Sequence, residues 1–329
     1  MGPVAPDSAE FARATEPFRR ELLAHCYRML GSADDAEDLV QETYLRAWRS
    51  YRGFKGQSSE RTWLYRIATN ACLNALEHGS RRVLPSGLGG PEPDPETAPE
   101  LAGPEVRWLQ PIPDALVSPE EADPAAIVTA REGLRLALIA SLQYLPGPQR
   151  AVLILRDVLA FPAAEVAAML GTTVAAVKSS LQRARARLRE VAPAADDVTE
   201  PAEPRARALL DQYIAAFQNA DAAALQRLLC ADATLEATPF RTWLAGCETC
   251  VPFLRAWVLG APGDWRMLPA ARANGQPAAV CYHRDRDGPY QAYGIVTLTM
   301  TAAGITRIIS FGDPALVRSF GFPPVWPAA

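Results

Sequence analysis

Side chains suited to holding single-stranded DNA are concentrated between residues 53 and 82 of the 329-residue chain. A loop with glycine and serine leads into a segment in which aromatic rings are interleaved with arginine and amide side chains. Flat rings stack on bases, amides bind base edges and arginines bind phosphates, so this mixture is typical of proteins that bind unpaired DNA. The candidate residues are Trp63, Tyr65, Arg66, Asn70 and Asn74. The alternative is that Trp63 and Tyr65 belong to a hydrophobic core, and we expect this of one of them.

Residues 144–190 fit the pattern of a helix-turn-helix closely. Counted from Ala163, a small residue, Ala167, stands at the fifth position and Gly171 at the ninth. The small side chain lets two helices approach each other, and glycine adopts the left-handed backbone conformation of the turn between them. Apolar residues fill the fourth, eighth, twelfth and fifteenth positions, namely Val166, Leu170, Val174 and Val177.

The second helix of this motif, expected over residues 173–189, carries side chains suited to reading duplex DNA. A recognition helix presents its N-terminal half to base edges in the major groove and its later basic residues to phosphates. The candidates are Ala175, Lys178, Ser179, Gln182, Arg183, Arg185 and Arg187. The motif therefore predicts DNA binding in preference to an ordinary helical hairpin.

A dense acidic patch lies earlier in the chain. In residues 33–51, apolar side chains recur at helical spacing, and the remaining face carries Asp34, Asp35, Glu37, Asp38 and Glu42. Taken alone, the patch predicts a solvated helix face whose acids lie near the helix N-terminus, where the helix dipole favours negative charge.

The elements that must position these residues fall into separate segments. Residues 11–82 are rich in helix-forming residues and carry a net charge of +3, and residues 148–191 carry +4. Between them, residues 83–131 hold ten prolines and a net charge of −7. That composition predicts a long linker, because it offers too little apolar surface to offset the entropy lost on ordering. An apolar island at residues 106–112, which includes a tryptophan, interrupts the linker, and we expect it to dock on a domain or a partner.

The overall composition excludes several classes of protein. With 49% hydrophobic and 21% charged residues, the chain can form two or three domains with ordinary cores, and collagen-like, disulfide-scaffold and fully disordered proteins are excluded. No apolar run approaches the roughly 18 residues of a membrane span, and the first residues lack a signal-peptide pattern, so we expect a soluble, cytoplasmic protein. The net charge of −4 does not exclude nucleic acid, because a polyanion responds to the local field of the two basic blocks.

Residues 205–329 differ in pattern from the rest of the chain. One helical segment gives way to β-type runs, and residues 290–300 alternate with the period of a strand. The residue types that could act as catalytic acids or bases are Tyr213, Asp232, Glu236, His283, Tyr290 and Tyr293, but no pair has a spacing that singles it out. The aromatic residues Phe217, Trp243, Trp257 and Trp265 are more typical of a core than of a ligand cage.

The six cysteines form no short, cysteine-dense framework, so we expect reduced thiols. Cys247 and Cys250 have the spacing of a redox pair or of half a zinc site. Because no second pair of this kind and no nearby histidine pair accompanies them, the sequence predicts no metal and no cofactor. Two cysteines on one helix face are the simpler interpretation.

The two helical blocks resemble regions two and four of bacterial sigma factors. The resemblance rests on ELLAHCYRMLGSADDAEDLVQETYLRAW and FKGQSSERTWLYRIATNACLNAL in the first block and on the helix-turn-helix in the second. Their order, without an intermediate domain, is similar to that of the extracytoplasmic-function (ECF) group. The family implies one all-α domain over residues 11–82 and a second over residues 132–192, joined by the linker.

The resemblance also implies partners for the candidate surfaces. Core RNA polymerase would bind the acidic patch through the coiled-coil clamp of its β′ subunit, and the residues that match the family motif are Asp35, Asp38, Leu39, Gln41 and Glu42. The loop with Lys55 and Arg61, together with the helix after it, would open the downstream promoter element and hold a flipped base. The recognition helix would bind the upstream element, and the acidic linker would pass through the polymerase toward the RNA exit.

The tail resembles SnoaL-like domains, which have the cone-shaped α+β fold of ketosteroid isomerase and nuclear transport factor. We therefore expect a multidomain protein with two all-α helical domains and a C-terminal α+β domain over residues 205–329. A subgroup of ECF factors carries such a tail, so the resemblance implies a non-enzymatic regulator that acts through a small-molecule ligand or an intramolecular contact. Two alternatives remain: an enzyme or sensor domain fused to a helix-turn-helix module, and a dimeric repressor, which would leave residues 62–70 unexplained.

Overall fold

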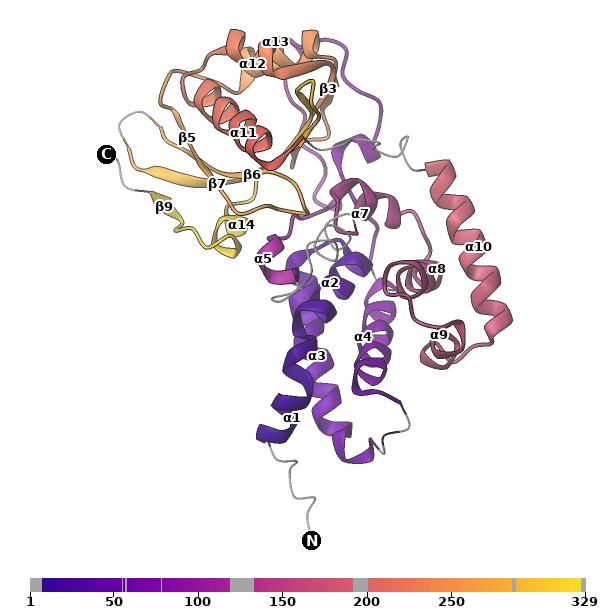
Figure 1. Ribbon diagram of the computed structural model, residues 1–329. Coiled ribbons are helices and arrows are strands. Elements are labelled where there is room, and N and C mark those ends of the chain that lie inside the picture. The colour runs from indigo at the N-terminus through magenta and orange to yellow at the C-terminus, as the bar shows by residue number, and fades with distance from the viewer. Residues whose placement is uncertain are drawn as a thin grey trace. The chain divides into compact units, whose positions relative to one another are not determined.

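The computed structural model describes residues 8–54, 56, 58–77, 79–118, 133–191, 201–285 and 288–326 (Figure 1). The chain forms two compact units. Unit 1 contains residues 1–82 and 116–193, and unit 2 contains residues 83–115 and 194–329. The chain therefore passes through unit 2 twice, once before and once after the second helical block.

The first part of unit 1 is a bundle of helices. They are α1 (Ser8–Thr15), α2 (Arg19–Leu30), α3 (Ala33–Ser50) and α4 (Glu60–Glu77), with short 3₁₀ turns at Glu16–Phe18 and Tyr51–Gly53. Two adjacent residues separate α2 from α3. Gly31 ends α2 with a φ of 72°, and the Ser32 hydroxyl accepts a hydrogen bond from the Asp35 amide at 3.1 Å, which starts α3.

The second part of unit 1 contains the predicted helix-turn-helix. Its elements are α7 (Leu136–Leu142), α8 (Gly147–Leu153), a π-helical turn η4 (Ile154–Val158), α9 (Ala163–Met169) and α10 (Val174–Val191). Gly171, between α9 and α10, has a φ of 61°, so the predicted left-handed turn is confirmed. Val166 and Val177 are buried as predicted, whereas Val174 is 38% exposed and lies outside the core.

The two parts of unit 1 pack against each other through α4, which contacts both α8 and α9. Arg150 of α8 is only 4% exposed, and its guanidinium donates to Gln143 Oε1 at 2.8 Å, to the Leu145 carbonyl at 3.1 Å and to the Met29 carbonyl. Burial lowers the pKa of Arg150 to about 10, so this side chain is still charged at neutral pH. Because a buried charge is stable only with such partners, Arg150 ties α2 to the turn between α7 and α8.

Unit 2 has the expected α+β fold. Its strands are β3 (Leu229–Thr238), β4 (Trp243–Ala245), β5 (Trp265–Pro269), β6 (Ala278–His283), β7 (Tyr290–Met300), β8 (Ile305–Phe311) and β9 (Val325–Trp326). The sheet order is β4-β3-β8-β7-β6-β5, and β9 pairs with β7. Strands β3 and β8 are parallel, and the other neighbouring strands are antiparallel.

The helices of unit 2 supply the other half of its core. Helices α11 (Glu203–Gln218), α12 (Ala222–Leu228) and α13 (Cys247–Trp257) lie together beside the sheet, and α14 (Pro314–Ser319) follows β8 (Figure 1). Their apolar side chains and those of the strands form one hydrophobic cluster. Phe217 and Trp265 belong to it, as the sequence predicts, whereas Trp257 is 46% exposed.

Residues 83–115 belong to unit 2, which differs from the predicted linker over residues 83–131. This segment contains a 3₁₀ turn η3 (Pro85–Gly87) and β2 (Arg107–Trp108), which pairs with β1 (Arg82–Val83), and α5 (Asp114–Val117) follows. Leu109 and Ile112 of the apolar island are buried at 1% and 0% exposure, so the island docks as expected. Composition did not predict that the rest of the segment is ordered, because the backbone of the segment forms its hydrogen bonds with the C-terminal domain. The remainder of the predicted linker, residues 119–131, lies outside the described residues.

Candidate DNA and polymerase surfaces

The exposed face of α10 carries the predicted recognition residues. Val177, Leu181 and Ala184 recur at helical spacing and are buried, which turns the opposite face of the helix to solvent. The Thr173 hydroxyl accepts a hydrogen bond from the Ala176 amide at 3.1 Å and fixes the start of the helix. The exposed side chains are Ala175, Lys178, Ser179, Gln182, Arg183, Arg185 and Arg187.

Two of these arginines have different environments. Arg183 donates to Ser179 Oγ at 2.8 Å, one turn earlier on the same helix, and forms no ion pair among the described residues. Arg185 forms a two-point ion pair with Asp157 at 2.7 and 2.8 Å. Arg183 is therefore the side chain that is available to a phosphate, whereas Arg185 stabilises the contact of α10 with the π-helical turn.

On α4, the exposed candidates are Arg66, Asn70 and Asn74, which follow one another at intervals of four residues and so share one helix face. An arginine and two amides on one face can bind phosphate and base edges. Lys55, in the loop before α4, lies outside the described residues.

Trp63 and Tyr65 both lie in the core, at 4% and 0% exposure, although the sequence predicted this of only one of them. Trp63 stacks on Phe54 with ring centroids 4.8 Å apart, and the Tyr65 hydroxyl donates to Glu21 Oε2 at 3.2 Å. Helix α4 packs against α2 and α3 and also against α8 and α9. Neither ring is therefore available for base stacking in this arrangement.

The start of α4 is engaged by the second helical block. Arg61 forms an ion pair with Glu21 at 2.9 Å, and its guanidinium lies over the Phe161 ring, 4.6 Å from the centroid. The Thr62 hydroxyl donates to Glu165 of α9 at 2.9 Å. Arg61 is a predicted DNA-binding residue, and protein groups occupy it here, so DNA binding by this side chain requires α4 and α9 to separate.

The predicted polymerase-binding residues lie along α3. All are at least partly exposed: Asp35, Asp38, Leu39, Gln41 and Glu42. The sequence analysis missed Leu45, which is 52% exposed and shares their face, because it lies three, four and seven residues after three of them. The spacing of Leu45 from these residues could have identified it in the sequence. Leu45 adds an apolar side chain that a protein partner would bury.

Two carboxylates of this face have intramolecular partners. Asp35 pairs with Arg82 at 2.6 Å, and Glu42 pairs with Arg46 at 2.7 Å one turn later. Asp38 has no ion-pair partner among the described residues. The Glu42–Arg46 pair is exposed, and pairs of this kind contribute only about 0–1 kcal/mol, so Glu42 can exchange this partner for a basic surface.

In unit 2, Glu236 joins the C-terminal domain to the segment of residues 83–115. It is 1% exposed, accepts a hydrogen bond from Arg307 Nε at 3.0 Å and accepts another from the Ser86 amide at 2.8 Å. Because Glu236 alternates with Leu235 of the core, it lies on the sheet face away from α11–α13. The residue was a catalytic candidate in the sequence, and the structure gives it a structural role.

The end of the same segment is held by a second set of hydrogen bonds. The Ile112 amide donates to Asn274 Oδ1 at 2.9 Å, and the Asn274 amide donates to the Ile112 carbonyl at 3.1 Å. The Asp114 amide donates to the Arg272 carbonyl at 2.9 Å, and Asp114 Oδ1 accepts from the Gly275 amide at 2.8 Å. Nothing in the sequence pairs residues so far apart, and the sequence analysis missed both Asp114 and Asn274.

The remaining catalytic candidates do not converge on one site. Asp232 is exposed, the His283 ring lies against Trp265, and the Tyr290 hydroxyl donates to the Gly263 carbonyl at 2.8 Å. Tyr213 and Tyr293 line an apolar cavity of about 260 Å³ between the helices and the sheet. No histidine, aspartate or glutamate is among the described residues that line this cavity.

The cysteine pair has the character of buried structural thiols. Cys247 and Cys250 begin α13 and are free, and burial raises the pKa of Cys250 to about 12. Burial also raises the pKa of Cys247. A thiol must ionise to exchange disulfides or bind metal, so this environment favours the interpretation of two cysteines on a helix face. Among the described residues, no group of three or more histidine, cysteine, aspartate or glutamate side chains could hold a metal ion.

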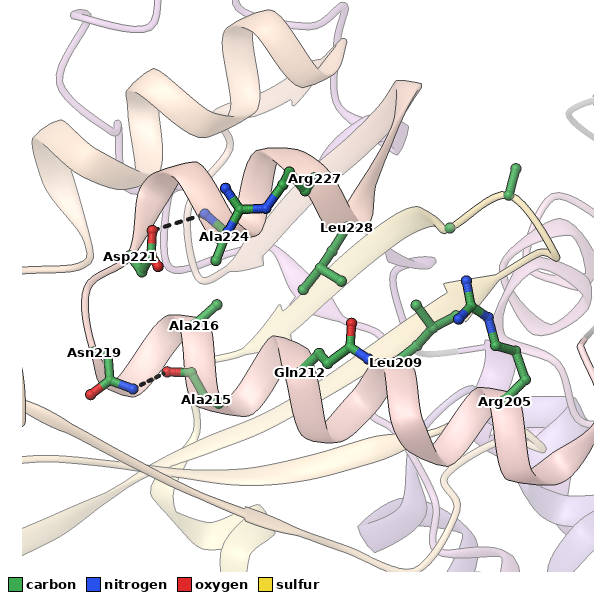
Figure 2. A pocket seen from close by; sticks show the side chains of 12 residues that line it. Arg205, Leu209, Gln212, Ala215, Ala216, Asn219, Asp221, Ala224, Arg227 and Leu228 are labelled. Atoms are coloured by element: carbon green, nitrogen blue, oxygen red, sulfur yellow. Dashed lines mark hydrogen bonds between the residues drawn. The ribbon is translucent and has the colours of Figure 1, made fainter.

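An open groove of about 520 Å³ lies on the outer side of α11 and α12. Figure 2 shows that Arg205 and Gln212 of α11 line it together with Arg227 of α12. The Asp221 side chain within it accepts a hydrogen bond from the Ala224 amide at 2.9 Å and starts α12. The groove mixes polar and apolar groups and is open to solvent, in contrast to the apolar cavity on the inner side of α11.

An exposed basic recognition helix beside a helical bundle with an acidic face defines unit 1 as a DNA-binding protein of transcription. The family model described as Sigma-70 region 2 matches residues 15–82, and the one described as Sigma-70, region 4 matches residues 135–188. The ECF RNA polymerase sigma factor SigG of Mycobacterium tuberculosis (strain CDC 1551 / Oshkosh) is 49% identical over 318 residues, which cover 95% of this chain and 84% of SigG. The chain belongs to the family of ECF RNA polymerase sigma factors.

Two further comparisons agree with this family. The probable ECF RNA polymerase sigma factor SigI of the same strain is 27% identical over 300 residues, covering 90% of this chain and 91% of SigI. The crystal structure of the Mycobacterium tuberculosis ECF sigma factor SigJ has a TM-score of 0.60 at 23% identity, with coverage of 97% of this chain and 100% of that chain. This likeness confirms the multidomain fold.

Membership of the family confirms the predicted role in transcription initiation. The protein binds core RNA polymerase and promoter DNA and acts in transcription initiation, so a dimeric repressor is no longer a tenable interpretation. In the part of the chain that the structure describes, no helix is both long and apolar enough to span a bilayer.

Proposed function

We propose that the C-terminal domain regulates promoter-specific initiation by holding residues 83–115, the segment between the two DNA-binding blocks. The observation that carries the proposal is that this segment forms one compact unit with the C-terminal domain. The sigma-factor resemblance implies that the segment passes through the polymerase. It cannot do so while its backbone pairs with the C-terminal domain, so the docked state lowers initiation and release raises it.

The strength of the docking supports a regulatory contact rather than an incidental one. The Ile112 amide and the Asn274 side chain are both buried at 0% exposure, and their mutual hydrogen bonds exclude water. A buried amide left without a partner costs about 1–3 kcal/mol, so losing one bond shifts the docking equilibrium by one to two powers of ten.

The same proposal assigns the surfaces of unit 1. The exposed face of α3, which contains Asp38 and Leu45, binds core polymerase, and the exposed face of α10 binds the upstream promoter element. Arg66, Asn70 and Asn74 of α4 bind the downstream element. The acidic face of α3 suits a basic protein surface, and the basic face of α10 suits a phosphate backbone, which supports this assignment.

We also propose that the C-terminal domain acts without catalysis and that the protein works in the cytoplasm, with core polymerase. The cavity is lined by no carboxylate or imidazole among the described residues. Burial raises the pKa of Cys281, the thiol among the described lining residues, to about 12, so this thiol offers no base or nucleophile at neutral pH. Turnover of a small molecule by the full chain would contradict this part of the proposal.

The test of regulation is transcription in vitro with core polymerase and a promoter that the protein recognises. Asn274 has a φ of 54°, so Asn274→Gly keeps the turn geometry and removes the side chain that accepts from Ile112. We expect this variant to raise specific transcription severalfold at limiting protein concentration. Asn219→Gly is the matched control, because among the described residues the Asn219 side chain binds only the Ala215 carbonyl, at an exposed helix end. Unchanged or lower transcription by Asn274→Gly would refute the proposed regulation.

A further inference from the structure

The first turn of the recognition helix α10 presents side chains without a polar group. Val174 is 38% exposed, and Ala175 and Ala176, which follow it, are also exposed. These three residues form what we call the apolar tip. The turn that precedes the tip is open as well, because a Cβ added at Gly171 would meet no atom within 4 Å. The apolar tip is therefore accessible to a large partner.

The exposure of Val174 differs from what its spacing predicts. Val177 and Leu181, three and seven residues later, are buried at 1% and 9% exposure, and this spacing would place Val174 with them in the core. Valine is also a weak helix former, so it contributes little to the start of α10. Neither the helix nor, at this exposure, the core accounts fully for an apolar side chain here. A contact with a partner would bury it.

The apolar tip is held in a fixed position at the start of α10. The Thr173 hydroxyl accepts from the Ala176 amide at 3.1 Å, and the Thr173 carbonyl accepts from the Val177 amide at 3.0 Å. Lys178 is exposed four residues after Val174 and lies on the same helix face. Because a recognition helix directs its N-terminal residues to base edges, the tip faces the bases ahead of the basic residues.

The chemistry of the major groove identifies the base that such a tip can recognise. Guanine, adenine and cytosine present only hydrogen-bond donors and acceptors there, whereas thymine also presents its apolar C5-methyl group. An apolar side chain against a donor or acceptor leaves that polar group without a partner, which is unfavourable. Against the methyl group, both apolar surfaces are removed from water. The tip therefore favours thymine.

We propose that Val174 is a specificity-determining residue that contacts the C5-methyl group of one thymine in the upstream promoter element. This inference rests on the proposed assignment of α10 to that element and adds the base that its first turn selects. The small side chain of Ala175 beside Val174 lets the base edge approach closely.

The test measures how promoter affinity depends on single methyl groups. The full chain is assembled with core polymerase, and a promoter duplex is selected from a random pool with this holoenzyme. Each thymine of the upstream element is then replaced in turn by deoxyuridine, which lacks the methyl group but keeps the same hydrogen-bonding edge. We expect one replacement to weaken binding of the wild type about fourfold, the effect of losing one buried methyl group. Val174→Ala should bind the thymine and deoxyuridine duplexes equally at that position.

Two further variants serve as controls. Val174→Ile keeps an apolar contact, so its sensitivity to the methyl group should persist. Val325→Ala removes a valine of similar exposure, 42%, from β9 of unit 2 and should behave as the wild type does. The absence of any sensitive thymine, or full sensitivity in Val174→Ala, would overturn the proposal. So would a Val174→Ala variant that loses affinity for core polymerase while its response to deoxyuridine is unchanged, because a protein would then be the partner of Val174.

Lys178→Ala separates this proposal from the assignment of α10 itself. If Lys178→Ala weakens promoter binding but no thymine is sensitive, α10 binds the promoter and the role of Val174 is refuted. If Lys178→Ala leaves promoter binding unchanged and no thymine is sensitive, both the assignment of α10 and the role of Val174 are refuted.

Discussion

The contact between Glu236, Arg307 and Ser86 allows the docking of residues 83–115 to be separated from the stability of the C-terminal domain. Glu236 is 1% exposed and Arg307 is 19% exposed, so their ion pair is largely removed from water. Glu236→Leu leaves the Arg307 charge without a partner and also removes the acceptor of the Ser86 amide. Breaking a buried pair by removing one partner costs about 3–5 kcal/mol, and the residual exposure of Arg307 places the expected loss near 3 kcal/mol.

The double variant separates the two effects. In Glu236→Leu/Arg307→Met both charges are gone, and replacing a buried pair by apolar residues of similar size is close to neutral, so unit 2 regains most of its stability. The Ser86 amide remains without its acceptor. A hydrogen bond to a carboxylate contributes about 1.5–3 kcal/mol, so its loss accelerates exchange of the Ser86 amide about 30-fold. Arg307→Met alone destabilises unit 2 but keeps the acceptor, so Ser86 exchanges no faster than the sheet around it.

Hydrogen exchange measured residue by residue is the appropriate assay, because it distinguishes local release of the segment from global unfolding of unit 2. The amides of β7 and β8 report the stability of the sheet, and Ser86 reports docking. Two results would refute the reasoning. One is normal Ser86 protection in the double variant, and the other is a double variant whose sheet is as unstable as that of Glu236→Leu.

Three further predictions concern unit 1. Burial lowers the pKa of His25 to about 3 from an unfolded value near 6.5, so between these two pH values only the unfolded chain binds this proton. The stability that the neutral imidazole preserves is fully present above pH 6.5. It falls by about 1.4 kcal/mol per pH unit as the pH drops toward 3. The free energy of unfolding measured in urea should therefore fall between pH 6.5 and pH 4.5 by about 2.5 kcal/mol more in the wild type than in His25→Gln. An equal fall in both proteins would contradict the assignment. The Cβ added by Gly171→Ala meets no atom within 4 Å, but the alanine must hold a φ of 61°. We therefore expect the free energy of unfolding of the helix-turn-helix, measured by thermal unfolding, to fall by about 1 kcal/mol, and a stabilised variant would refute the strain argument. Arg183→Ala should weaken promoter binding and reduce the slope of log affinity against log salt by about 0.9, while Arg318→Ala, on α14 of unit 2, leaves that slope unchanged.

Local sequence patterns predicted those features whose causes lie within about 20 residues. Gly171 and the spacing of Val166 and Val177 fix the helix-turn-helix, because each acts on the helices next to it. The burial of both Trp63 and Tyr65 could not be predicted in this way. Helix α4 acquires its second packing partner from residues about a hundred positions later, and no periodicity within α4 records that contact.

The composition of residues 83–115 gave an incomplete account of the segment, because the structure places it in one unit with the C-terminal domain. Its prolines and acids form no core of their own, which is what the entropy argument states. The partners that order it, including Glu236 and Asn274, lie some 150 residues away. The sequence analysis selected Glu236 only as a catalytic candidate and did not select Asn274. The role of a buried polar group depends on the group that it contacts, and only the fold shows which group that is.

Because the chain passes through unit 2 twice, the docking of residues 83–115 and the binding of polymerase are parts of one equilibrium. Residues 83–115 are covalently continuous with both DNA-binding blocks, so a polymerase that takes up this segment must remove it from the cavity wall that Pro99 completes. Coupling free energies are reciprocal. Docking must therefore weaken the affinity for core polymerase by the same factor by which core polymerase weakens docking, and polymerase should accelerate exchange of the Ala102 amide, which donates to the Pro239 carbonyl at 3.0 Å in the docked state. Asn274→Gly, which removes the acceptor of the Ile112 amide, should raise the affinity for core polymerase and accelerate the same exchange without polymerase; unchanged exchange with saturating polymerase would refute the competition.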